Sequence, residues 1–96
     1  MGATTFFTEA RGETAEKAFN AAVQDACFEH GNGGYTGTIA EKSEFVLIEV
    51  PEGTDPHSFA HELIDASDER VDSKWGPAGC IQLDVHEFLF FGWASE

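Results

Sequence analysis

Basic residues are scarce in this sequence, which has five lysines and arginines against eighteen aspartates and glutamates and a formal net charge of −13 at pH 7. A surface with this balance repels nucleic acid and anionic membranes and attracts basic partners. We therefore expect a partner protein with a basic surface, and no direct contact with nucleic acid or membrane. Solubility or adaptation to high salt would explain the same charge without a binding role, and the sequence leaves that alternative open.

Cysteine is scarcer still, since Cys27 and Cys80 are the only two and they lack the paired spacing of metal or redox motifs. Both are predicted to be small buried apolar residues. The N-terminus has no charged-then-apolar leader, and no stretch approaches the ~18 apolar residues that span a bilayer. These absences predict a reduced, soluble, cytoplasmic protein.

Apolar residues, by contrast, are plentiful. They make up 42% of the 96 residues, and nine of them are phenylalanine, which is enough to bury a core despite the charge. The length fits one domain, residues 1–96, because it is too short for two cores.

Apolar periodicity predicts two helices. Over residues 14–30 the apolar positions recur at the spacing of one helical face for more than three turns, with Thr14 as the N-cap and Gly31 placed to end the helix. A second helix is predicted over residues 55–69, where Asp55 and Pro56 supply an acidic cap followed by proline.

Strands are predicted over residues 4–9, 35–41, 45–50 and 80–85, which are rich in β-branched and aromatic residues or alternate in polarity. Lys42 and Ser43 form a polar link that suits an antiparallel hairpin. The run 88–93 either prolongs the last strand into one long bent strand or doubles back as a further strand. The order β-α-β-β-α-β predicts an α+β, ferredoxin-like fold, with an antiparallel sheet, both helices on one face and a possible extra C-terminal strand.

Histidine spacing supplies the one candidate metal site. His57 and His61 lie four residues apart on the second predicted helix, and imidazoles at this spacing can bind one metal ion. The HExxH context is missing, and a solvated polar stripe is the simpler explanation of the pair. We therefore expect no bound metal and no cofactor, and keep both histidines as weak candidates.

The aromatic residues suggest an interface. Trp75 lies in a glycine- and proline-rich loop and Trp93 ends the aromatic run 88–93, and tryptophan is enriched at binding hot spots. That run has aromatic rings on both faces of its strand, whereas helices on one side of the sheet would cover only one of them. The uncovered rings predict a partner interface or a homodimer formed through the C-terminal strand.

Negative charge is densest in the second half, where residues 49–96 hold eleven acids and two bases. A row of carboxylates can imitate the phosphates of nucleic acid in front of a basic groove. The predicted partner-binding residues are therefore Trp75 and Trp93 together with four acids: Asp65, Asp68, Glu69 and Asp72.

The stretch Gly-Gly-Tyr-Thr-Gly-Thr-Ile-Ala-Glu-Lys at residues 33–42, after an alanine-rich helix, resembles small uncharacterised proteins encoded by bacteriophages and related mobile elements. Residues 75–79, Trp-Gly-Pro-Ala-Gly, are similar to the same group. The resemblance implies a small accessory protein in the cytoplasm of an infected host cell, and it carries over no activity and no functional residue.

Three functional hypotheses follow. The leading one is a non-enzymatic, phage-type accessory protein that binds and inhibits a host protein, with acidic side chains in place of nucleic-acid phosphates. The second is a small metal-dependent enzyme or binding module that uses His57 and His61. The third is a self-assembling structural protein joined through its aromatic C-terminal strand. No serine has the flanking residues of a catalytic nucleophile, which favours a protein that is not an enzyme.

Overall fold

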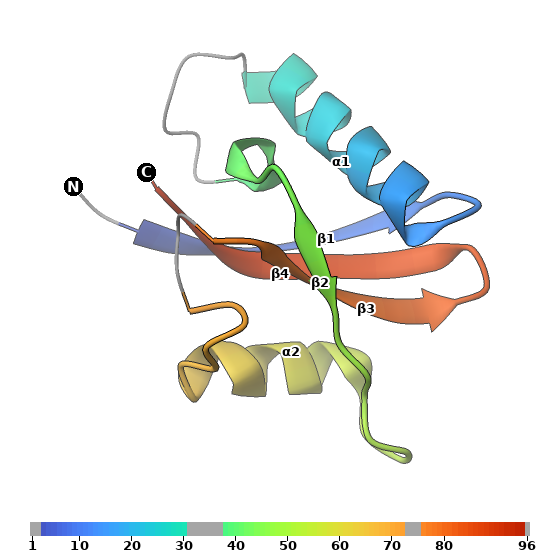
Figure 1. The fold of residues 1–96 in the computed structure, drawn as a ribbon, viewed down its shortest axis with the longest axis vertical. Helices are drawn as coiled ribbons and strands as arrows, with labels where there is room; N and C mark the ends of the chain where they lie inside the picture. The colour runs from blue at the N-terminus through green and yellow to red at the C-terminus, as the bar shows by residue number, and fades with distance from the viewer. Residues whose placement is uncertain (1–2, 31–37, 73–75, 96) are drawn as a thin grey trace.

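The computed structural model describes residues 3–30, 38–72 and 76–95. Its elements, in chain order, are β1 (Ala3–Arg11), α1 (Ala15–His30), the short 3-10 helix η1 (Ile39–Glu41), β2 (Phe45–Leu47), α2 (Pro56–Asp65), β3 (Ala78–Asp84) and β4 (Glu87–Ser95) (Figure 1). The α+β class is confirmed, and a four-stranded sheet with two helices is compatible with a ferredoxin-like α+β fold in the elements it contains, although the strand pairing and the helix faces differ from those predicted. None of the helices in these ranges is long and apolar enough to cross a membrane.

Both helices begin where their capping residues predict. The Thr14 hydroxyl accepts a hydrogen bond from the Lys17 N–H at 3.1 Å, and the Asp55 carboxylate accepts one from the Ser58 N–H at 2.9 Å. Each bond satisfies an N–H that has no partner inside the helix. The predicted end of α1 at Gly31 lies outside the described residues.

The sheet has the strand order β1-β4-β3-β2, so the last strand of the chain lies between the first and the third. β4 is antiparallel to both of its neighbours, whereas β2 and β3 are parallel. The sheet is therefore mixed, and the prediction of a wholly antiparallel sheet is wrong. A parallel neighbour needs a crossover connection, and α2 supplies it between β2 and β3.

The helices cover opposite faces of the sheet, which corrects the prediction that both lie on one face (Figure 1). Phe88 and Phe90 of β4 pack in the core cluster beneath α1, whereas Leu89 and Phe91, which alternate with them, pack in the cluster beneath α2. The strand order explains the arrangement. The chain crosses the sheet in one direction from β1 to β2 and returns from β2 to β3, and two crossovers of the same hand in opposite directions place their helices on opposite faces.

Between α1 and β2 the structure differs from the predicted strand over residues 35–41. Residues 35–37 lie outside the described ranges, and Ile39–Glu41 is a 3-10 turn started by Thr38, whose hydroxyl accepts the Ala40 N–H at 3.2 Å. The predicted hairpin at Lys42 and Ser43 is thus wrong. Lys42 is instead buried, and its Nζ donates to the Gly76 carbonyl at 2.9 Å.

The C-terminal run forms two strands, which decides between the two predicted alternatives. The turn between β3 and β4 contains neither glycine nor proline. It is held by Asp84, whose carboxylate accepts the Val85 N–H at 2.7 Å, and the β3–β4 pairing shifts register between Gln82 and Asp84. A bulge of this kind lets a strand turn without a glycine.

Candidate functional site

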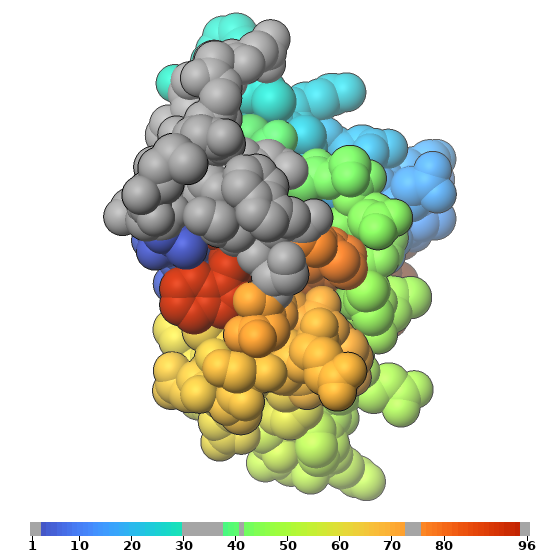
Figure 2. Space-filling view, turned by 60° about the vertical axis from the view of Figure 1, so that its left-hand side comes forward, coloured from blue at the N-terminus to red at the C-terminus, as the bar shows by residue number. Residues whose placement is uncertain are grey.

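Six exposed carboxylates lie on α2 and on the segments that enter and leave it. Figure 2 shows these segments, coloured from light green to orange, in the lower part of the view. We call this set the acidic surface, and its members are Glu52, Asp55, Glu62, Asp65, Glu69 and Asp72. The predicted candidates Asp65, Glu69 and Asp72 all belong to it. Because α2 covers the face of the sheet opposite α1, the acidic surface lies on one side of the molecule.

Asp68, the fourth acidic candidate, has a structural role. Its carboxylate accepts hydrogen bonds from Nε and Nη2 of Arg70, at 2.9 and 3.0 Å, and from the Arg70 backbone N–H at 3.0 Å. These bonds, first those from the guanidinium, lower the pKa of Asp68 to about 2. Asp68 therefore stays ionised and paired with Arg70. Among the described bases, Arg70 is the closest in sequence to the acidic surface, and its guanidinium is bonded to Asp68.

Asp55 is also engaged, because it caps α2. The backbone N–H of Ser58 holds the pKa of the Asp55 carboxyl below its usual value. This carboxylate lies at the positive end of the helix dipole, which favours its charged form further.

The two histidines on α2 face β1. His57 Nε2 lies 2.9 Å from Oε2 of Glu9, and the His61 ring stacks on Phe7 with centroids 4.0 Å apart. Within residues 3–30, 38–72 and 76–95, no group of three or more histidines, cysteines or acids is arranged to hold a metal ion. Cys80 is fully buried, which raises its pKa to about 12, and Cys27 is only half-buried, so the prediction that both are buried holds for one of them.

The aromatic candidates are mostly internal. All of residues 88–91 are buried, because each face of β4 lies beneath a helix, so the premise of uncovered rings on this strand is wrong. Trp93 is half-buried against the cluster beneath α2, and its buried indole N–H has no acceptor among the described residues. Trp75 lies outside the described residues.

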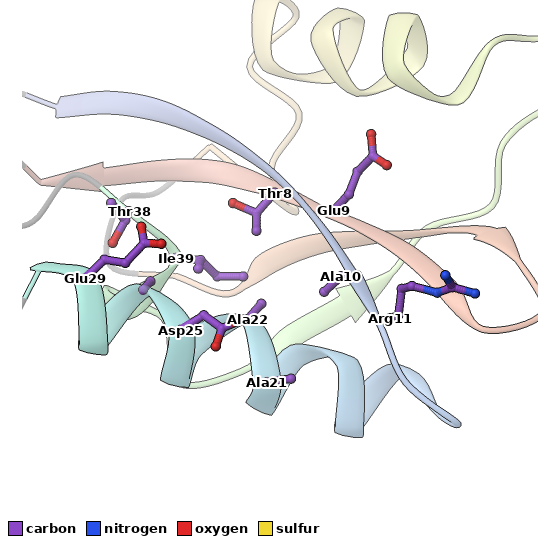
Figure 3. A pocket seen from close by; sticks show the side chains of 11 residues that line it. Thr8, Glu9, Ala10, Arg11, Ala21, Ala22, Asp25, Glu29, Thr38 and Ile39 are labelled. Carbon is purple, nitrogen blue, oxygen red and sulfur yellow. The ribbon is translucent and has the colours of Figure 1, made fainter.

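A hollow of about 540 Å³ lies between α1 and β1 (Figure 3). The described residues that line it come from β1, α1 and the turn before β2: Thr8, Glu9, Ala10, Arg11, Ala21, Ala22, Asp25, Ala26, Glu29, Thr38 and Ile39. Asp25 and Glu29 rise from α1, whereas the Glu9 side chain points away from this helix toward α2. No site is predicted here from the sequence. Its sequence pattern is Ala22 and Ala26, one helical turn apart, with Ala21 beside them and acids at 25 and 29.

Comparison of the chain with protein families, with curated proteins and with solved structures found no match.

Proposed function

We propose that this protein is a non-enzymatic binding protein that attaches to a basic surface of another protein and blocks it. The observation that supports this function is the acidic surface, six exposed carboxylates gathered around one short helix. Because residues 33–42 resemble phage and mobile-element proteins, we further propose that the blocked protein is a protein of an infected host cell.

The described bases are bonded elsewhere or lie on other parts of the fold, and Arg11, at the end of β1, lines the hollow beside α1. Arg70 is bonded to Asp68, and Lys17 lies on α1, 3.4 Å from Glu13. Lys42 is buried and donates to a backbone carbonyl. The field of the acidic surface therefore extends into solvent, where it accelerates the encounter with a basic partner and is screened over ~8 Å at physiological ionic strength.

A helix with carboxylates along its exposed side suits a groove built for nucleic acid. Such a groove presents lysine and arginine side chains to closely spaced phosphates. Glu62 and Asp65 on α2, with Glu69 beyond its end, offer negative charges on a rigid support because the buried side of the helix is fixed by Ala60 and Leu63. The support keeps the charges in place before the partner arrives, which lowers the entropy lost on binding.

The test is capture followed by competition. Immobilised protein is exposed to host lysate at low salt, and the retained proteins are identified by mass spectrometry and then challenged with duplex DNA. We expect a basic, nucleic-acid-binding protein that duplex DNA displaces, since both ligands would occupy the same groove. Retained proteins that DNA leaves in place would contradict the mimicry. The matched control is immobilised Glu62→Gln/Asp65→Asn/Glu69→Gln protein, which should retain less of the same partner.

A further inference from the structure

The outer edge of β1 is unpaired in the described sheet, where β1 contacts β4 on one side and is the last strand of the order. The Gly12 N–H donates to the His86 carbonyl at 3.1 Å, which continues the β1–β4 register by one step. In an antiparallel ladder, pairs that exchange hydrogen bonds alternate with pairs that do not. Even-numbered residues of β1, such as Thr8, therefore bond to β4. Phe7 and Glu9 direct their N–H and C=O groups outward.

The hollow lies between α1 and this edge strand, and four consecutive residues of β1, Thr8 to Arg11, line it (Figure 3). A strand added to a sheet lies ≈ 4.8 Å from its neighbour, and every second side chain of that strand points to the same face. Here those side chains would enter the hollow. Ala22 and Ala26 leave room there because their side chains are single methyl groups, and Ile39 lies at its inner side (Figure 3).

We propose that the hollow receives an extended basic peptide segment of another protein, added antiparallel to β1 as a fifth strand. The segment would present small β-branched side chains to the alanines of α1 and lysine or arginine to the carboxylates of Asp25 and Glu29. Recognition of this type combines main-chain hydrogen bonds with pockets for alternate side chains.

Charge decides between this occupant and a second copy of the chain. Pairing β1 with β1 of another copy would bring together two molecules of charge −13 each. A basic segment instead meets two acids on the α1 wall, with Arg11 as the one base among the described lining residues. The proposal does not depend on the acidic surface, which lies on α2 and its flanking segments, on the opposite face of the sheet from α1.

The probe is a fluorescent nonapeptide, Lys-Thr-Val-Thr-Lys-Thr-Val-Thr-Lys, titrated against the full chain. In antiparallel addition with the lysines and valines facing α1, the threonine N–H groups bond to β1 and the valine N–H groups point away. Methylating the backbone nitrogen of the two central threonines should weaken binding about tenfold, because two hydrogen bonds are lost. Methylating the two valines should leave affinity nearly unchanged. If methylation of the threonines and methylation of the valines weakened binding equally, strand addition would be overturned. A cationic peptide that is merely adsorbed to an acidic protein would bind equally well in either methylated form.

Amide hydrogen exchange supplies a readout on the protein itself. In the free protein the outward amides of Phe7 and Glu9 should exchange fast, and the peptide should slow them about tenfold or more. Protection already present without peptide, together with a dimer in sedimentation, would place a second copy at this edge and overturn the proposal.

Two variants of equal charge change test the carboxylate contact. Asp25→Asn removes an acid that lines the hollow, and Gln24→Lys adds one positive charge at the neighbouring exposed residue, which does not line it. We expect Asp25→Asn to weaken peptide binding at least threefold more than Gln24→Lys, and equal effects would contradict the proposal. Asp65→Asn/Glu69→Gln/Asp72→Asn should bind the peptide like the parent, which separates this site from the proposed function.

Discussion

At the residue scale, Asp68 lies among the acids around α2 but is paired with Arg70, two residues further along the chain. The Asp68 carboxylate accepts hydrogen bonds from the backbone N–H and the guanidinium of Arg70. The Asp68 backbone carbonyl accepts one from the Val71 N–H at 3.0 Å. Val71 is buried at the end of this turn. The ion pair therefore fixes the path by which the chain leaves α2 and returns to the core.

Asp68→Asn should lower the free energy of unfolding at pH 7 by about 1 kcal/mol, because it weakens charge-assisted hydrogen bonds at a partly exposed site. The folded pKa is lowered from 3.8 to about 2, so the stabilisation is present above pH 3.8 and is lost as the pH falls through 2. Urea unfolding between pH 7 and pH 2.5 checks this, with Glu69→Gln as the control. A parent–variant difference that stays constant over this range would show that ionisation of Asp68 does not stabilise the fold.

Residue-level prediction succeeded where the chemistry is local. Thr14 and Asp55 cap their helices as expected, since a cap depends on the residue and the three that follow it. The local sequence predicts Lys42 in a polar hairpin link, whereas Lys42 is buried and its ammonium donates to the Gly76 carbonyl across 34 positions of sequence. No local pattern reveals a partner that distant.

At the element scale, the end of α2 is held by an unusual residue. Ser67 has φ of 54°, and its N–H donates to the Ile64 carbonyl while the Asp68 N–H donates to the Leu63 carbonyl. This pair of bonds is the motif that glycine normally completes, because glycine reaches the left-handed region without steric cost. The helix consequently ends at Asp65, four residues before its predicted end.

Ser67→Gly should raise the free energy of unfolding by about 1 kcal/mol, because it relieves a left-handed non-glycine residue. Ser67→Ala should give no gain, since alanine keeps the Cβ that causes the strain. Thermal and urea unfolding of the two variants provide the comparison. Equal stability of Ser67→Gly and Ser67→Ala would contradict this account of the helix end.

Element prediction failed where two local tendencies competed. Residues 38–41 alternate enough to predict a strand, but the Thr38 hydroxyl accepts a nearby backbone N–H and starts a 3-10 turn. The sequence between β3 and β4 contains no glycine or proline to mark a turn, and the Asp84 carboxylate accepts the Val85 N–H at the turn that forms there. In both segments a hydrogen bond from a backbone N–H to a nearby side chain, Thr38 or Asp84, stabilises a turn that the local pattern does not predict.

At the scale of the whole molecule, the α+β class was predictable, and the faces covered by the helices were not. Element types follow from periodicity along the chain, whereas strand order depends on contacts between distant segments. The chain crosses the sheet from β1 to β2 and returns to β3, which sends α1 and α2 to opposite faces, and β4 then pairs between β1 and β3. This arrangement buries the aromatic strand. It also leaves the acidic surface and the hollow beside β1 as separate surfaces, of which the sequence indicated only the first.

The central claim, that the acidic surface binds a basic partner, is tested most directly by the association rate constant with the captured partner. The variant is Asp65→Asn/Glu69→Gln/Asp72→Asn, which omits Asp68 because Arg70 already pairs with it. The matched control, Glu13→Gln/Glu16→Gln/Glu44→Gln, removes the same charge from exposed residues in the first half of the chain.

At low salt the association rate of the acidic-surface variant should fall about tenfold and that of the control much less, because steering depends on charge near the contact. The difference should shrink as salt rises and the Debye length shortens. Equal rate constants for the two variants at low salt would contradict the claim that this surface binds the partner.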